Sequence, residues 1–255
     1  MRPVPAEELK SIAGWLPAEA PGPDAIVGHV ATTGNGRAWA DRWPRPAAVL
    51  VETGGNYLLA GAPAAVDPAA LRPLVAGFLA AADGFDEVLD EAFPGRIRWD
   101  RVVYRLPDPG SPPAPAPDPP GGRVRPLRPG DTLALEQLSD AVRWVAKTWG
   151  GPAGLAASGH GYGAFVDGRL AAVTCTFFLG ARYADAGVAT EPELRQRGLG
   201  VASARAWCAG AIAAGRVPSW TTSIDNTGSR RIAERLGFEL VRRDVLHVIG
   251  VEIPS

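Results

Sequence analysis

The pattern of apolar and polar positions in the second half of the chain predicts short strands and helices that follow one another. Gly161–Val166 and Leu170–Leu179 read as two strands joined by an Asp167-Gly168 turn. The other predicted elements are a strand at Arg123–Leu127, a helix from Asp131-Thr132 to about Trp149, strands at Tyr183–Thr190 and Ser219–Ile224, helices at Gly198–Ala214 and Thr227–Leu236, and final strands from Phe238. Gly215 ends the helix predicted at Gly198–Ala214, since glycine readily adopts the left-handed conformation there.

The first half of the chain shows a similar mixture of elements. They are a short helix at Glu7–Leu16, a strand at Pro46–Glu52, a hairpin turn at Gly54-Gly55-Asn56, a strand at Tyr57–Gly61, an apolar helix at Pro68–Asp83, a short element beginning at Val88–Glu91, and a strand at Arg101–Leu106. This mixture predicts an α+β or α/β unit, and it carries no catalytic signature of its own.

A proline-rich segment, Pro107–Gly122, separates the two halves. Half of its 16 residues are proline, which favours extended polyproline II structure and cannot continue a helix or a central strand. We therefore expect an N-terminal α/β domain at 1–106, a semi-rigid linker at 107–122 and a second domain at 123–255. A long surface loop within a single domain is the alternative.

Composition excludes several classes of protein. The 26 Lys and Arg residues nearly cancel the 27 Asp and Glu residues, which argues against a general nucleic-acid binder. No apolar run reaches the roughly 18 residues of a membrane-spanning helix, and the first residues lack the apolar core of a signal peptide. Cys175 and Cys208 are too few for a disulfide framework or a cysteine-based zinc site. We expect a soluble, cytoplasmic protein that needs no metal.

The segment Thr190–Gly200, with sequence TEPELRQRGLG, has the pattern of an anion-binding loop. It follows an apolar strand and opens an amphipathic helix, whose first N–H groups lack internal partners and whose dipole favours an anion. Gly198 and Gly200 allow close approach of the backbone to a pyrophosphate, and Arg195 and Arg197 add positive charge. The spacing matches neither the dinucleotide fingerprint nor a P-loop. A glycine-rich turn with solvated arginines is the alternative.

A second element, Asp225–Phe238, follows, with Asn226 lying 26 residues after Gly200. Together the two elements resemble the GNAT superfamily of N-acyltransferases, in which an R/Q-x-x-G-x-G/A loop precedes an N-x-x-A/S-x-x-x-Y-x-x-x-G-F segment. The resemblance spans about Gly122–Ile253. Gly187–Thr190 and Pro218-Ser219-Trp220 are similar to the zwittermicin-resistance acetyltransferases. Trp39–Val51 is similar to the leading half of glycine N-acyltransferase-like proteins.

The resemblance implies the fold and the site of the acyl donor. It implies an α/β (α+β) mixed sheet that splays in the second domain, and a first domain that is a degenerate GNAT-like half. Acetyl-CoA, or another acyl-CoA, would be the co-substrate. The residues expected to bind it are Val188, Thr190, Arg195, Gln196, Arg197, Gly198, Leu199, Gly200, Val201, Asn226 and Ser229. Asn226 also fits a plain helix N-cap, and the two readings are compatible.

Three residues are candidates for catalysis. Asp185 is the first candidate for the base that deprotonates the acceptor, because GNAT enzymes often carry an acid near this place and alternation sets it apart from Ala184 and Ala186. A solvent-facing position is the alternative. His160, in a glycine-rich stretch, is the second candidate, against an ordinary surface histidine. Ala233 occupies the position of the family's tyrosine acid, and Ser229, one turn earlier, is a substitute.

These features imply an acyl-CoA-dependent N-acyltransferase. The simplest activity is acetyl transfer from acetyl-CoA to a primary amine of a small molecule, by direct attack in a ternary complex. A catalytically silent acyl-CoA-binding regulatory module is one alternative. Another is an acyltransferase that takes its acyl group from an acyl carrier protein. The sequence leaves open the acceptor, the acyl chain length, the role of the first domain and whether the chain forms a homodimer.

Overall fold

The structure is a computed structural model that describes residues 1–16, 18–107, 118–119 and 122–253. The described part of the first half contains β1 (Arg2–Pro3), η1 (Ala6–Trp15), α1 (Ala25–Thr33), β2 (Arg37–Ala40), β3 (Ala48–Thr53), β4 (Asn56–Gly61), η2 (Pro63–Ala65), α2 (Pro68–Leu71), β5 (Gly77–Ala81), α3 (Asp86–Ala92) and β6 (Ile97–Arg105). Most of the predicted linker lies outside the described residues.

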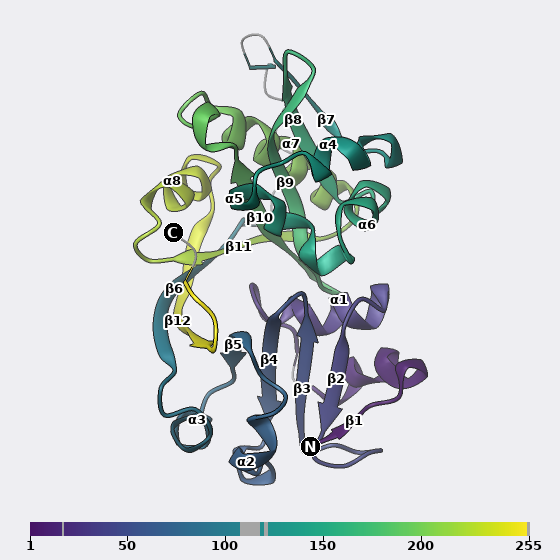
Figure 1. Cartoon of the computed structure of the whole chain (residues 1–255), viewed down its shortest axis with the longest axis vertical. Coiled ribbons are helices and arrows are strands. Elements are labelled where there is room, and N and C mark those ends of the chain that lie inside the picture. The colour runs from purple at the N-terminus through teal and green to yellow at the C-terminus, as the bar shows by residue number, and fades with distance from the viewer. Residues whose placement is uncertain (17, 108–117, 120–121, 254–255) are drawn as a thin grey trace.

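The second half follows with the same alternation of strands and helices (Figure 1). It contains β7 (Gly122–Pro126), η3 (Pro129–Asp131), α4 (Thr132–Glu136), α5 (Asp140–Arg143), η4 (Trp144–Trp149), α6 (Pro152–Ala157), β8 (Gly161–Val166), β9 (Arg169–Leu179), β10 (Tyr183–Thr190), η5 (Pro192–Leu194), α7 (Leu199–Ala213), β11 (Val217–Ser223), α8 (Thr227–Arg235) and β12 (Glu239–Ile249).

All of these strands join one mixed sheet, and the two halves exchange a strand within it. The order is β1-β2-β3-β4-β5-β12-β6-β11-β10-β9-β8-β7. β6, the last strand of the first half, pairs antiparallel with β11 of the second half. β12, the last strand of the chain, pairs antiparallel with β5 of the first half. Since β6 and β12 also pair with each other, the two expected domains share a continuous sheet.

The second half buries both faces of its part of the sheet. α7 and α8 pack on one face, where Trp207 and Ala233 meet Ala184, Tyr104 and Trp220. The segment from α4 to α6 packs on the other face, in a cluster with strand residues of β9. Between the halves, α1 packs against β3 and β9, so the first half also helps to cover this second face. The mixed α/β fold class expected from the sequence is confirmed.

Most predicted strands are present, but the apolar helix expected at Pro68–Asp83 is wrong. Only α2 forms there, and the chain then turns into strand β5. Pro73 has no N–H and therefore removes a helical hydrogen bond, although Arg72 before it still has helical backbone angles (φ −53°, ψ −45°). Gly77, at φ +145°, lies so close to the Gly55 carbonyl that a side chain would not fit.

The long helix expected from Asp131 to Trp149 is also wrong, because the segment breaks into short helical pieces. Glu191, buried at the end of β10, accepts hydrogen bonds from both the N–H (2.9 Å) and the hydroxyl (2.6 Å) of Ser139. Ser139 adopts an extended backbone conformation there (ψ 159°), and α5 begins after it. The sequence pattern likewise gave no expectation for α1 and β2.

Candidate active site

The sheet of the second half opens between β10 and β11. The two strands pair in parallel from Tyr183 opposite Val217 to Ala186 opposite Trp220, and no further. Beyond Ala186, β10 continues to Thr190 while pairing only with β9 on its other side. Val188 and Thr190 are partly exposed along this free edge. Its unpaired N–H and C=O groups can therefore receive an extended ligand in the manner of an added strand.

The loop below this opening ends in a helix N-terminus without a side-chain cap. Gly198 is the N-cap of α7 with φ +78°, and among the described residues no side chain accepts a hydrogen bond from the first N–H groups of the helix. Leu199, Gly200 and Val201 occupy the first three helical positions, whose N–H groups have no partner within a helix. The helix dipole adds partial positive charge at the same point, so this N-terminus is suited to an anion.

Gly200 and the residues before Gly198 shape this loop further. A Cβ on Gly200 would lie 3.2 Å from Thr190 Oγ1 and 3.3 Å from Ile232 Cδ1, so only glycine fits without a shift. Gln196, like Gly198, has a positive φ (+62°). Arg195, Gln196 and Arg197 are all exposed. The loop thus presents two arginines beside the helix N-terminus, as the sequence predicted.

The N-terminus of α8 lies across the opening from this loop. Asn226 Oδ1 accepts the Ser229 N–H at 3.0 Å, so the N-cap reading of Asn226 is confirmed. Ser229 Oγ in turn accepts the indole N–H of Trp220 at 2.9 Å. Trp220 is the last residue of β11 that pairs with β10, so this contact lies at the apex of the opening. Ala233, at the position of the family's tyrosine, is fully buried.

Asp185 lies on β10 with its side chain on the face opposite α7, while Ala184, Ala186 and Val188 pack with α7, as alternation predicted. It is buried, at 3 % exposure. Its Oδ1 accepts hydrogen bonds from Ser219 (2.8 Å) and Thr221 (3.1 Å) on β11. Burial raises the pKa of Asp185 to about 6, although both hydroxyls and the nearby Arg101 and Arg242 act to lower it. The alternative interpretation of Asp185, a solvent-facing position, is therefore wrong.

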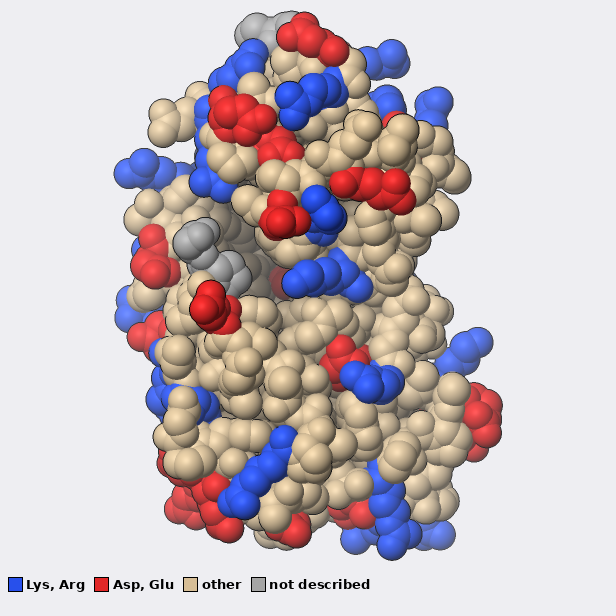
Figure 2. Space-filling view, viewed as in Figure 1, with Lys and Arg blue, Asp and Glu red and all other residues tan. Residues whose placement is uncertain are grey.

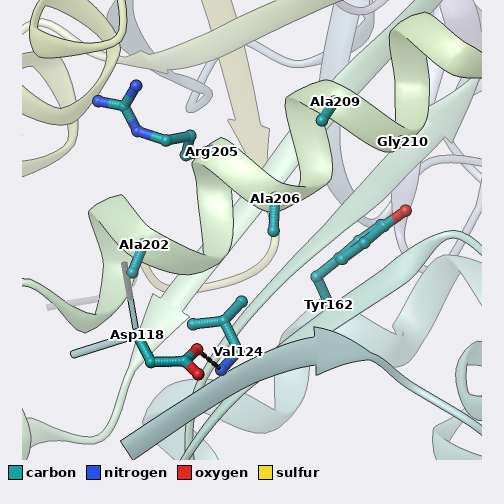
Figure 3. Close-up of a pocket in the computed structure, with 8 residues that line it drawn as sticks. All are labelled: Asp118, Val124, Tyr162, Ala202, Arg205, Ala206, Ala209 and Gly210. Carbon is teal, nitrogen blue, oxygen red and sulfur yellow. Dashed lines mark hydrogen bonds between the residues drawn. The ribbon is translucent and has the colours of Figure 1, made fainter. Parts of the chain in front are cut away.

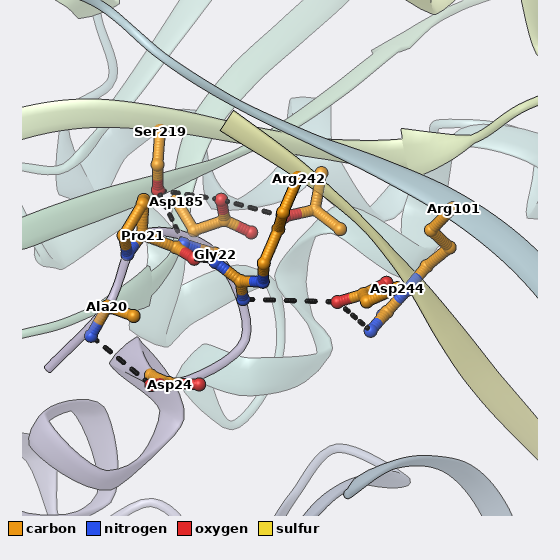
Figure 4. A network of polar contacts seen from close by, with 10 residues as sticks. Ala20, Pro21, Gly22, Asp24, Arg101, Asp185, Ser219, Arg242 and Asp244 are labelled. Atoms are coloured by element: carbon orange, nitrogen blue, oxygen red, sulfur yellow. Dashed lines mark hydrogen bonds and ion pairs between the residues drawn. The ribbon is translucent and has the colours of Figure 1, made fainter. Parts of the chain in front are cut away.

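A segment of the first half covers Asp185 (Figure 4). The Gly22 N–H donates to Ser219 Oγ at 3.2 Å, and the same Ser219 hydroxyl donates to the Asp185 carboxylate, so Ser219 connects the Pro21-Gly22 segment to Asp185. Arg242 on β12 donates to the Pro21 carbonyl at 2.8 Å. Arg101 and Asp244 form a two-pronged ion pair beside them, at 2.8 and 3.1 Å. Figure 2 shows a hollow in the molecular surface at the level of β11, between the two halves.

His160 lies apart from this cluster. It is partly buried with its ring stacked on Trp149, the ring centroids being 5.3 Å apart. Burial, helped by Arg216, lowers the pKa of its imidazole. No hydrogen bond among the described residues joins its ring to Asp185 or to the open edge of β10. The structure therefore does not bring the second base candidate together with the first.

The two cysteines are unsuited to nucleophilic chemistry. Cys175 and Cys208 are both buried, and burial raises the pKa of each thiol to about 12. Over the described ranges, no three His, Cys, Asp or Glu side chains gather in a way that could hold a metal ion. The helices of those ranges are also too short or too polar for any of them to cross a membrane.

A cavity of about 310 Å³ lies outside the opening, on the side of α7 that faces β8 (Figure 3). Ala202, Ala206, Ala209 and Gly210 of α7 form one wall, and Tyr162 lies opposite. Asp118 accepts the Val124 N–H at 2.8 Å and closes one end. The cavity contains no group of the candidate site, so we assign it no role in catalysis.

Several residues around Asp185 escaped the sequence analysis. Ser219 and Thr221 alternate along a predicted strand, which places both on one face, but the sequence does not show that this face meets Asp185. Gly22, Arg242 and Arg101 come from distant parts of the chain and meet only because the strands β6 and β12 are exchanged. Strand pairing, which no local motif encodes, is what assembles these residues.

Comparison with known proteins agrees with this geometry. The family model described as GNAT acetyltransferase matches residues 131–243. An uncharacterized N-acetyltransferase in the mutA 5′ region of Streptomyces virginiae is 42% identical over 207 residues, which are 81% of this chain and 86% of that protein.

Two solved structures share the fold over nearly their full length. A GCN5-related N-acetyltransferase-like protein from Streptococcus suis has a TM-score of 0.71 at 16% identity and covers 95% of this chain and 98% of its own. A tandem GNAT protein from the clavulanic acid biosynthesis pathway has a TM-score of 0.60 at 16% identity, with 96% of each chain covered. Sequence relative, family model and fold agree, and the chain is an enzyme of the GNAT acetyltransferase family.

Proposed function

We propose that this enzyme transfers an acetyl group from acetyl-CoA to a primary amine of a small molecule. The observation that carries the proposal is the uncapped N-terminus of α7 next to the open edge of β10. The N–H groups of Leu199, Gly200 and Val201 would hold the pyrophosphate, and Arg195 and Arg197 would add charge. Val188 and Thr190 would pair with the amides of the pantetheine arm.

Asp185 would act as the base that takes a proton from the acceptor ammonium. A pKa near 6 leaves the carboxylate ionised at neutral pH and close enough to neutrality to exchange a proton. Ser219 and Thr221 hold one oxygen of the carboxylate, and Oδ2 accepts no hydrogen bond from the described residues. The second oxygen is thus the one that would meet the amine. His160 is the weaker candidate, because it lies apart.

The amine nitrogen would attack the thioester carbonyl directly, without an acyl-enzyme. Both cysteines are buried thiols, which supports this route over a covalent one. A free N–H near Val188, on the open edge of β10, would stabilise the oxyanion that forms on the carbonyl oxygen. The electron pair of the broken C–S bond would leave on sulfur.

The first half would be a degenerate GNAT-like copy that no longer binds a donor. Its order of elements repeats that of the second half, with α2 in the place of α7. It would contribute to the second half in two ways. Strand β6 pairs with β11 in the sheet, and the segment at Pro21-Gly22 covers Asp185.

A matched pair of glycine variants tests the donor site. Gly198 and Gly215 flank the same helix with φ +78° and +72°, and neither would place a Cβ within 4 Å of another group. Valine at either position imposes similar backbone strain. We expect Gly198→Val to abolish acetyl-CoA binding in calorimetry, and Gly215→Val to retain it.

Equal affinity in both variants would remove the anion site from the N-terminus of α7. Titration of the wild-type enzyme with acetyl-CoA, CoA and dephospho-CoA separates the alternatives. Binding without any acyl transfer to a panel of amines would favour a silent acyl-CoA-binding module. Failure to bind all three would favour a donor carried on an acyl carrier protein.

A further inference from the structure

Trp220 and Ser229 form a directed pair at the point where β10 and β11 separate. The indole N–H can only donate, so the Ser229 oxygen is the acceptor of this 2.9 Å bond. Trp220 is only 2 % exposed, and the ring of Phe238 packs edge-on against it at 5.6 Å. The indole is therefore fixed, and it fixes the Ser229 oxygen.

The Ser229 proton is left without an acceptor of its own. Ser229 is the third residue of α8, and among the described residues its hydroxyl does not donate to a preceding carbonyl, the bond that serines in helices often make. Ser203 in α7 makes such a bond, to Gly200. Within the described ranges the Ser229 hydroxyl donates no hydrogen bond. Its hydrogen is thus free to point into the opening, where Ser229 is partly exposed.

We propose that Trp220 is a positioning residue that orients the Ser229 hydroxyl as a hydrogen-bond donor to the departing thiolate of the acyl donor. This inference rests on the proposed function. The pair would take the place of a tyrosine at position 233, where the buried Ala233 packs in the same cluster as Trp220.

The pair stabilises charge and transfers no proton. As the amine nitrogen forms its bond to the carbonyl carbon, the C–S bond breaks and its electron pair stays on sulfur. Ser229 donates a hydrogen bond to that sulfur and keeps its proton, because a serine hydroxyl is a weaker acid than a thiol. Asp185 receives the first proton of the acceptor ammonium. The nitrogen loses its second proton to water as the tetrahedral intermediate collapses to the amide, and the thiolate is protonated by water after release. The indole N–H makes the hydroxyl a better donor by polarising its oxygen.

The pKa of the thiol of bound CoA measures the hydrogen bond from Ser229 to the sulfur, and this measurement needs no amine substrate. The probe is CoA itself, titrated against pH on the wild-type enzyme while the ultraviolet absorbance of the thiolate is followed. A hydrogen bond to a charged group is worth enough to shift its pKa by about one unit. We expect Ser229→Ala to raise the pKa of the bound thiol by about that amount, and Trp220→Phe to raise it in the same direction. The double variant should resemble Ser229→Ala alone.

Trp207→Phe is the matched control. Trp207 is also a buried indole of the same cluster, and its N–H donates at 3.0 Å to the hydroxyl of Thr176 on β9, the strand on the other side of β10 from β11. It should leave the pKa of the bound thiol unchanged. Additive effects of the two variants, or no change in Ser229→Ala, would overturn the proposal even where CoA binds normally. Failure of the wild-type enzyme to bind CoA would overturn the proposed function as well.

Discussion

The two halves of the molecule share one topology, yet only the second presents the features of a donor site. In the first half, β4 and β5 pair in parallel over four positions, from Asn56–Phe78 to Leu59–Ala81. In the second half, β10 and β11 pair in parallel over four positions as well. The next strand in the sheet comes from the other half in both cases: β12 lies beside β5, and β6 lies beside β11. The fold therefore does not by itself make the site.

The helix that joins each pair of parallel strands shows the first difference. α7 has 15 residues and begins at a glycine that leaves its N–H groups open. α2 has four residues and begins at Pro68, which has no N–H. The Asp67 carboxylate accepts the Ala69 N–H at 2.9 Å, so an anion already occupies the start of α2. A phosphate at α2 would meet a negative charge, whereas at α7 it would meet open donors.

The third of the four paired positions shows the second difference. It is Asp185 opposite Ser219 in the second half and Leu58 opposite Ala80 in the first. Leu58 and Ala80 belong to an aliphatic core cluster. The second half instead buries a carboxylate there, at the cost of its solvation. Destabilising groups of this kind are typical of functional sites.

The largest expected effect is on the rate of acyl transfer. Asp185→Asn keeps the shape and removes the base, so we expect kcat to fall about 100-fold or more, with little change in acetyl-CoA affinity. The wild-type rate should rise with pH through about 6, as Asp185 ionises. Release of thiol with the most reactive amine of a panel measures both.

Asp41→Asn, in the first half, is the control for this rate. Asp41 accepts two backbone N–H bonds far from the opening between β10 and β11, and its replacement should leave kcat unchanged. A full-rate Asp185→Asn enzyme would mean that the second half differs from the first only in donor binding.

The buried carboxylate should also be visible in stability. Asp185 has a pKa of about 6 in the folded chain against 3.8 for an ordinary aspartate, so the folded state holds its proton more tightly than the unfolded state. Its contribution to the free energy of unfolding therefore falls as pH rises from about 4 to above 6, by about 3 kcal/mol. The Asp185→Asn variant has no carboxylate at this position, so its free energy of unfolding should not show this fall with pH.

Denaturant unfolding of the two proteins at pH 4 and pH 8 measures the difference. Relative to the wild type, the free energy of unfolding of the variant should rise by about 2.4 kcal/mol between these two pH values, because at pH 4 an unfolded aspartate is already partly ionised. Leu58→Asn supplies the contrast from the first half: it introduces no titrating group and retains Asp185, so its difference in stability from the wild type should not change with pH. A constant difference between Asp185→Asn and wild type would show that Asp185 has an ordinary pKa.

A smaller effect is expected from giving α7 the cap that α2 has. Gly198→Asp places a carboxylate at the helix N-terminus, while Gly198→Asn places a neutral side chain of the same shape, and both residues tolerate a positive φ. We expect the aspartate variant to bind acetyl-CoA about 30-fold more weakly than the asparagine variant, since a charge at a helix terminus is worth up to about 2 kcal/mol. Calorimetry on the two proteins isolates the charge, and equal affinities would contradict the anion site.

The sequence predicted the second half well because its signals are local. The glycines before α7, the turn at Asp167-Gly168 and the Asn226 cap each determine structure within a few residues. The prediction failed where contacts with distant residues override the local pattern. The segment Pro68–Asp83 has an apolar helical period, but Pro73 and Gly77 end the helix and the chain continues as a strand. The helix expected from Asp131 is interrupted at Ser139 by its hydrogen bonds to the distant Glu191. The surroundings of Asp185 could not be predicted, because Gly22, Arg101 and Arg242 reach it only through the exchange of strands between halves.

The stoichiometry of acetyl-CoA binding to the full chain tests the central claim most directly. Two copies of one topology offer two places between parallel strands, and the account allows a donor only at the N-terminus of α7. Calorimetric titration should therefore give one acetyl-CoA per chain, and none in Gly198→Val. Two equivalents per chain, or one that persists in Gly198→Val, would contradict the assignment of the donor site to the second half.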